Sequence, residues 1–232
     1  MYYLSFDCAT KTFAYSLSYV NLDIDHILKD FIEDLQRGEE NEQGEQGEAL
    51  QGEAIQKFQS LLQKYYLKLR SIIYLMDGAV VDFFPNIPDN KINTVDRIQK
   101  MSNYIKDTII PKLNDIPKLA DIEIFIEFQM GSNHKARMIS SALIALFSKY
   151  KVRLINPSLK NKVYITEEGK HKHFIKKYTN LYSANKEHAK YNFALIEEIF
   201  KSNIPQTKKN ERGHIADSFM QVLGFLLYGG NK

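Results

Sequence analysis

The chain has 232 residues, 44% of them hydrophobic, and its 31 Lys and Arg against 28 Asp and Glu give a formal net charge of +3. This length supports one substantial core, while the single cysteine, Cys8, excludes a disulfide framework and a cysteine-rich zinc site. Because the sequence has no apolar run of about 18 residues and no signal-peptide pattern at its N-terminus, we expect a soluble, intracellular protein that does not engage a membrane.

The N-terminal segment predicts a β-hairpin. Residues 2–7 and 12–20 are rich in aromatic and β-branched side chains, and a short polar stretch separates them. Asp7 falls at the end of the first strand. Residues 71–83 form a further strand-like run, whose central Asp-Gly pair marks a turn or a bulge. The predicted fold therefore begins with three antiparallel strands.

An insertion is predicted between the second and third strands, at residues 21–70. It contains two helical patterns joined by an acidic Glu/Gln/Gly tract at about residues 38–53. The tract has too few apolar residues to order itself, so we expect a flexible loop. The whole chain, residues 1–232, is then a single domain that carries this partly low-complexity helical insertion.

Helices and strands alternate after Pro88. The pattern predicts helices at 93–113 and 133–150, strands at 121–128 and 152–155, and C-terminal helices at 184–201 and 213–227. Strands separated by helices of this length pair in parallel through crossover connections. We therefore predict an α/β fold with a mixed five-stranded sheet, three antiparallel strands followed by parallel ones, flanked by helices.

Charge is distributed unevenly along the chain. Residues 1–90 hold 7 Lys and Arg against 15 Asp and Glu, whereas residues 91–232 hold 24 against 13. Within residues 151–209, 13 basic residues meet 5 acidic ones, and five aromatic rings are interleaved: Tyr164, Phe174, Tyr178, Tyr182 and Tyr191. Lysines neutralise phosphates and rings stack on unpaired bases, so this part predicts binding of a nucleic acid. Solvated lysines that only maintain solubility are the alternative.

Two pairs of residues are candidates for metal chemistry. Asp7 and Glu127 each close a strand, and a half-buried carboxylate there needs a cation or hydrogen-bond donors. His214 and Asp217 are three residues apart on a predicted helix, so they share a face and could bind one ion together. Acids are also ordinary at strand ends, and Asp217 could serve only the helix dipole.

Four segments, taken in order, resemble the RuvC-type Holliday junction resolvases of the RNase H-like superfamily, including the branch carried by poxviruses, iridoviruses and other large DNA viruses. They are the hairpin around Asp7, the strand end Ile126-Glu127-Phe128-Gln129, the segment Ile155 to Lys160, and His214-Ile-Ala-Asp217. The resemblance covers about residues 1–20 and 70–228. It implies an RNase H-like fold and a metal-dependent DNA endonuclease.

The resemblance also implies a catalytic site. Asp7, Glu127, His214 and Asp217 would bind two Mg²⁺ ions, with Mn²⁺ able to substitute, for phosphodiester hydrolysis without a small-molecule cofactor. Many relatives carry Asp where this chain has His214, and histidine suits Mn²⁺ better than Mg²⁺, so the preferred metal stays open. Lys160, or its neighbour Lys162, matches a basic position that contacts the scissile phosphate.

The implied activity is resolution of four-way DNA junctions by paired symmetric nicks, in recombination or in processing of replicated, possibly viral, DNA, in the cytoplasm or at a viral replication site. Paired nicks require a homodimer, and the helix predicted at 133–150 is apolar enough to contact a partner. Residues expected to bind DNA are Lys11, Gln129, Lys135, Arg137, Lys160, Lys162, Lys170, Lys172, Lys176 and Lys177.

Several alternatives remain at this point. The same fold could act on other branched or hybrid nucleic acids, or could bind nucleic acid without catalysis. A DnaQ-type exonuclease is disfavoured because its first strand carries Asp-x-Glu, whereas this chain has Ala9. An actin-like kinase is disfavoured because the chain lacks glycine-rich phosphate turns. The segment Cys8-Ala9-Thr10 departs from many viral relatives, which have a glycine soon after the first Asp.

Overall fold

A computed structural model describes most of the chain outside the predicted insertion. The described residues are 1–8, 12–21, 30, 64, 65, 67, 72–118, 121–128, 133–200 and 212–229. The acidic tract at 38–53 and nearly all of the predicted insertion at 21–70 lie outside these ranges, as do Lys11 and Gln129.

Five strands form one mixed sheet in the order β3-β2-β1-β4-β5. The strands β1 (Tyr2–Cys8), β2 (Thr12–Val20) and β3 (Ile73–Asp82) are antiparallel neighbours. The strands β4 (Ile122–Glu127) and β5 (Lys151–Ile155) continue the sheet in parallel with β1. The predicted α/β architecture, a mixed five-stranded sheet with three antiparallel strands followed by parallel ones, is confirmed.

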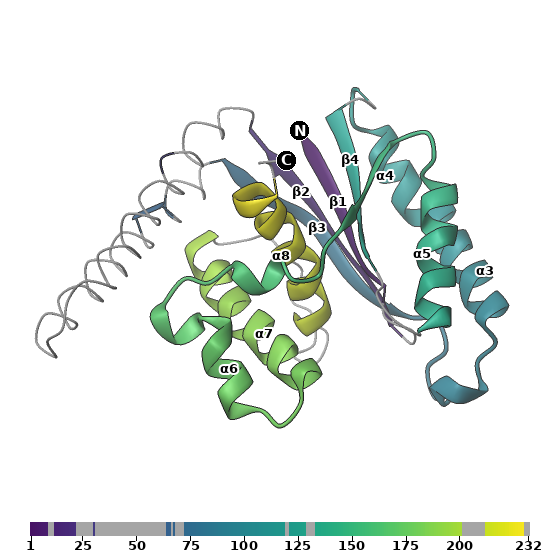
Figure 1. Ribbon diagram of the computed structural model, residues 1–232. Coiled ribbons are helices and arrows are strands. Elements are labelled where there is room, and N and C mark those ends of the chain that lie inside the picture. The colour runs from purple at the N-terminus through teal and green to yellow at the C-terminus, as the bar shows by residue number, and fades with distance from the viewer. Residues whose placement is uncertain are drawn as a thin grey trace, which may run out of the picture.

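Helices cover both faces of the sheet (Figure 1). One face packs against α3 (Thr94–Tyr104), a π-helical turn (Ile105–Ile109), α4 (Ile110–Asn114) and α5 (His134–Leu146). The other face packs against α8 (Arg212–Tyr228), beside which lie α7 (Leu181–Phe200) and α6 (His171–Lys177). Short 3₁₀ turns occur at Asp89–Lys91, Lys160–Lys162 and Glu167–Gly169. No helix among the described residues is both long and apolar enough to cross a bilayer.

The alternation of β1 determines which face carries its polar side chains. Leu4 and Phe6 belong to the core beneath α3 and α5. Since successive side chains of a strand point to opposite faces, Ser5 and Asp7 lie on the face that α8 covers. Both polar side chains are buried, so each needs a partner on the covering helix.

The third strand contains a bulge where an Asp-Gly pair predicted a turn or a bulge. The register with β2 shifts between Leu17, which pairs with Asp77, and Ser18, which pairs with Leu75. The strand then continues through Gly78, where a Cβ would lie 3.1 Å from the carbonyl oxygen of Tyr15. The bulge interpretation is therefore confirmed, and β3 remains one strand.

Two helical features differ from the sequence prediction. The helix predicted at 93–113 contains a π-turn directly before Pro111, whose ring lacks an N–H and crowds the preceding turn. The helix predicted at 184–201 begins earlier, at Leu181, because the side chain of Asn180 accepts a hydrogen bond from the amide of Ser183 at 2.8 Å. The short helix α6 was not predicted, because its seven residues are mostly basic and lack an apolar period.

Candidate metal centre

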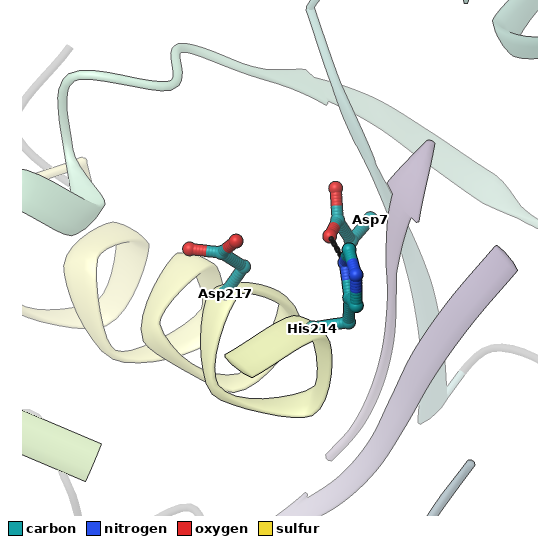
Figure 2. A group of neighbouring side chains, drawn as sticks. All are labelled: Asp7, His214 and Asp217. Atoms are coloured by element: carbon teal, nitrogen blue, oxygen red, sulfur yellow. Dashed lines mark hydrogen bonds and ion pairs between the residues drawn. The ribbon is translucent and has the colours of Figure 1, made fainter. Parts of the chain in front are cut away.

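Asp7, His214 and Asp217 converge between the sheet and α8 (Figure 2). One potential ligand atom from each residue lies within 4.8 Å of the other two. Asp7 comes from the end of β1, and the other two lie one helical turn apart near the start of α8. The Nδ1 atom of His214 is 2.8 Å from Oδ2 of Asp7. The structure thus brings together three of the four residues predicted to bind a metal.

Glu127 is linked to the same cluster by Lys160, which forms ion pairs with both Glu127 and Asp217. Glu127 ends β4, the strand adjacent to β1, so its carboxylate and that of Asp7 lie at the same edge of the sheet. The Nζ atom of Lys160 is 3.5 Å from Oε1 of Glu127 and 3.5 Å from Oδ1 of Asp217. Lys160 is only 7% exposed, whereas Lys162 is exposed. Of the two candidate lysines, Lys160 therefore lies among the acids.

Lys186 is a member of the cluster that the sequence did not single out. It lies on α7, and its Nζ atom is 3.2 Å from Oδ2 of Asp7 and forms an ion pair with Asp217. The same ammonium lies 3.4 Å from Nδ1 of His214. Packing of α7 against α8 brings Lys186 to this position. The sequence does not distinguish Lys186 from the many other basic residues around it.

Burial and charge act in opposite directions on these groups. Burial by itself would raise the pKa of Asp7, but the Lys186 ammonium, the hydrogen bond to His214 and the charge of Lys160 hold it well below its usual range. Burial raises the pKa of Glu127, as do the charges of Asp7 and Asp217, and Lys160 offsets only part of that rise. Asp7 is therefore a firmly ionised carboxylate, whereas an added cation beside Glu127 would favour its ionised form.

The two lysines show the complementary effect. Burial would lower the pKa of Lys160, but the carboxylates of Asp217, Glu127 and Asp7 outweigh it and raise the pKa. The pKa of Lys186 is likewise raised, because Asp7 and Asp217 outweigh burial. Both side chains are therefore positively charged at neutral pH.

Thr12 holds the imidazole of His214 from its other side. The Oγ1 atom of Thr12 lies 3.2 Å from Nε2 of His214. With Nε2–H donating to Thr12, a metal ion would bind Nδ1 in place of the proton that this nitrogen donates to Asp7 in the metal-free protein. That nitrogen is the one directed toward Asp7.

The cluster fits a divalent cation. Three carboxylates, of Asp7, Glu127 and Asp217, face two ammonium groups and leave a net negative charge in a buried site. The Oδ1 atom of Asp217 is buried and accepts no hydrogen bond from a described residue. Carboxylate oxygens and an imidazole nitrogen are suitable ligands for Mn²⁺, and the carboxylates also suit Mg²⁺.

The described residues among those predicted to bind DNA fall in three places. Lys160 belongs to the buried cluster. Lys135, which is half-buried, and the exposed Arg137 lie in the first turn of α5. The others lie on the side of the sheet that carries α6 to α8, where Lys162 lies over the ring of Tyr228, Lys170 over Tyr164 and Lys177 over Tyr178. Lys172 and Lys176 are exposed on α6.

No protein-family model matches the chain, and no curated protein matches it. Among solved structures, it is similar to T. thermophilus RuvC in complex with a Holliday junction substrate, with 11% identity, a TM-score of 0.48, and 99% of this chain and 95% of that chain covered. It is also similar to a second structure of Thermus thermophilus RuvC, with 12% identity, a TM-score of 0.47 and the same coverage of 99% and 95%. Both TM-scores lie below 0.5, so neither likeness assigns a function to this chain.

Proposed function

We propose that the protein is a metal-dependent endonuclease that resolves four-way DNA junctions by paired symmetric nicks, in recombination or in processing of replicated DNA, with a viral role as one setting. The observation that carries the proposal is the convergence of Asp7, His214 and Asp217, with Glu127 linked to them through Lys160. Three buried carboxylates beside two ammonium groups keep a net negative charge, which a bound divalent cation would compensate.

Asp7, Glu127, His214 and Asp217 would hold the metal. Bound Mg²⁺ or Mn²⁺ supplies a water nucleophile at neutral pH and stabilises the charge of the leaving oxygen during phosphodiester hydrolysis. Asp7 lies between His214 and Lys186, which hold its pKa below its usual range, so it is a ligand expected to remain charged well into the acidic range.

Lys160 and Lys186 would bind the scissile phosphate. Lys160 and Lys186 carry fixed positive charges next to the carboxylates, at a site that a scissile phosphate must approach. In a buried setting such preorganised charges stabilise a developing phosphorane more strongly than they would in water. Lys160 and Lys186 would thereby hold the phosphate against the acids that bind the metal.

The basic side chains around α6 would bind the DNA backbone. Lys172, Lys176 and Lys177 are exposed there, and Tyr182 is exposed at the start of α7, the helix that carries Lys186. Lysines can neutralise phosphates along a junction arm, while an exposed ring can stack on an unpaired base. These features favour DNA as the polyanion that enters the site.

Paired nicks require two active sites, so the proposal includes a homodimer. Met138 and Ile144 are exposed on α5, on the face of that helix not used by its buried residues Ile139 and Leu143. A monomer in light scattering at micromolar concentration would argue against junction resolution, while leaving a nuclease activity possible.

Gly224 controls where Lys160 lies. A Cβ at Gly224 would be 2.6 Å from the carbonyl oxygen of Leu159 and 3.0 Å from the amide nitrogen of Lys160, so the backbone of this segment rests directly on α8. Gly224→Ala should displace Lys160, with a loss of about 1–3 kcal/mol in unfolding free energy and of about 10- to 100-fold in cleavage rate. Denaturant unfolding and single-turnover cleavage measure the two effects.

Gly213→Ala is the matched control on the same helix. Its Cβ would lie 2.9 Å from Cε of Lys190, the flexible end of a side chain that can move. We expect wild-type stability and cleavage for this variant. Equal losses in both variants would show that any added methyl on α8 is harmful, and the role assigned to Gly224 would be wrong.

A labelled synthetic four-way junction and a linear duplex of the same sequence test the proposed function. Each is incubated with the protein and Mg²⁺, Mn²⁺ or EDTA, and the products are resolved at nucleotide level. We expect symmetric nicks in opposite strands of the junction only when metal is present. Cleavage of the duplex at an equal rate would reject junction selectivity, and the absence of cleavage of either DNA would reject the nuclease.

A further inference from the structure

Gln221 is a fully buried polar residue in the most apolar part of α8. It lies four positions after Asp217, and residues with this spacing share one face of a helix. Gln221 therefore faces the sheet at the level next to the metal cluster. A buried carboxamide requires partners for both its oxygen and its nitrogen.

Both partners are present, and they come from two adjacent strands. The Oγ atom of Ser5, on β1, donates a hydrogen bond to Oε1 of Gln221 at 3.0 Å. The Nε2 atom of Gln221 donates to Oε2 of Glu127, on β4, at 3.1 Å. An ionised carboxylate accepts hydrogen bonds but cannot donate them, so the amide nitrogen must face Glu127 and the oxygen must face Ser5.

This chain of hydrogen bonds distinguishes the two oxygens of Glu127. Oε2 accepts from Gln221, while Oε1 faces Lys160 at 3.5 Å, and the same ammonium is 3.5 Å from Asp217. The carboxylate is thus fixed at one oxygen and directed toward the cluster with the other. The carboxylate of Glu127 determines which way the amide of Gln221 points, and the hydroxyl of Ser5 donates to the oxygen that then faces β1.

We propose that Gln221 is a positioning residue, which orients Glu127 so that Oε1 is presented to the metal bound by Asp7, His214 and Asp217. The proposal rests on the metal-binding part of the proposed function. Gln221 touches neither metal nor DNA in this role, and it acts through the carboxylate of Glu127. Partners of this type, which hold a ligand in place, typically account for about 10- to 100-fold in metal affinity.

Mn²⁺ binding to the protein alone provides a test that does not depend on cleavage. Gln221→Met keeps an unbranched side chain of similar length but removes both hydrogen bonds. We expect Mn²⁺ affinity, measured by calorimetric titration without DNA, to fall about 10- to 100-fold. In cleavage assays the Mn²⁺ concentration needed for half-maximal rate should rise by the same factor, with the rate at saturating Mn²⁺ largely recovered.

A second variant separates positioning from stability. Gln221→Met leaves the hydroxyl of Ser5 without its partner, which by itself destabilises the core. The double variant Ser5→Ala with Gln221→Met removes both polar groups, so its unfolding midpoint should return toward that of the wild type while its Mn²⁺ affinity stays low. Recovery of stability and affinity together would mean that Gln221 has only a structural role, and the proposal would be overturned.

Ser218→Ala is the control for loss of a buried polar group on α8. The hydroxyl of Ser218 donates to the carbonyl oxygen of Ile215 within the same helix, so its removal should leave Mn²⁺ affinity unchanged. Wild-type affinity in Gln221→Met would reject the positioning role while leaving the proposed function intact. Tight Mn²⁺ binding that depends on Gln221, without junction cleavage, would uphold the role and reject the function, whereas a wild-type protein that binds no Mn²⁺ would reject both.

Discussion

Asp7→Asn is expected to abolish cleavage of a four-way junction while leaving binding of that junction unchanged or stronger. Asp7 lies between His214 and Lys186, which hold the pKa of its carboxyl group below its usual range. Asparagine keeps the size of the side chain but removes a charged ligand, and charge stabilisation of about 4 kcal/mol in the transition state corresponds to about 1,000-fold in rate. We therefore expect a loss of at least about 1,000-fold.

Junction binding by Asp7→Asn should be kept or strengthened, unlike cleavage, because DNA carries negative charge. Removing one buried negative charge from beside Lys160 and Lys186 lowers the repulsion that a phosphate meets on entry. Single-turnover cleavage and fluorescence anisotropy, the latter in Ca²⁺ or EDTA, measure the two quantities on the same junction. Asp107→Asn, at an exposed position on the other side of the sheet, is the control and should match the wild type in both assays. Full cleavage by Asp7→Asn would remove the proposed mechanism.

Lys186→Met is expected to destabilise the metal-free protein by about 3–5 kcal/mol at neutral pH, since it leaves buried carboxylates without a partner charge. Lys186 pairs with both Asp7 and Asp217, and it is largely shielded from solvent. Divalent metal should restore more stability to this variant than to the wild type, because the ion supplies the missing positive charge. Denaturant unfolding with EDTA, Mg²⁺ and Mn²⁺ measures these differences.

The loss of unfolding free energy caused by Lys186→Met should become smaller at acidic pH. In the wild type, the pKa of Asp7 in the folded state is below its ordinary value of 3.8, so the stability that its ionisation contributes is present above about pH 4 and is lost as the pH falls further. Without Lys186 most of that contribution disappears. The gap in unfolding free energy between wild type and Lys186→Met should therefore be constant from about pH 5 to pH 8 and should narrow below about pH 4.

Lys190→Met is the matched control for the loss of a lysine from α7. Lys190 is exposed and pairs with Glu187 on the same helix at 2.8 Å, so its removal should change stability by less than about 1 kcal/mol. A similar, pH-independent loss in both variants would show that Lys186 contributes through its aliphatic stem, and its role as a partner of the buried acids would be wrong.

Most of the sheet could be predicted from local patterns. Two runs of aromatic and β-branched residues, in β1 and β2, predicted a hairpin, and helices of sufficient length between the later strands predicted parallel pairing. The acids of the cluster were also visible in the sequence, because Asp7 and Glu127 each follow a buried run. His214 and Asp217 were found from their spacing on an otherwise apolar helix.

Lys186, on α7, could not be predicted as a member of the cluster from local sequence patterns. Lys186 is one of 13 basic residues between 151 and 209, and neither its spacing nor its neighbours separate it from the solvent-exposed ones. Only the packing of α7 against α8 selects it. Contacts between helices depend on the crossing angle and register, which a single sequence does not specify.

Gln221 did leave a signal in the sequence. It stands among Phe219, Met220, Val222 and Leu223 on a helix whose other residues are nearly all buried, and a polar side chain in such a setting requires a hydrogen-bond partner. Its distance of four residues from Asp217 indicated the direction of that partner. The identity of the partners, Ser5 and Glu127, required the register of two strands against α8.

The order in which the cluster residues occur along the chain bears on biosynthesis. His214 and Asp217 belong to α8, the last helix among the described residues, whereas Asp7 belongs to β1, which precedes them in the chain. A nascent polypeptide, or a product truncated before residue 214, lacks both α8 ligands and cannot assemble the cluster. A ribosome-bound chain that has not reached residue 217 would accordingly lack the proposed metal centre, although the basic residues of α6 are already present.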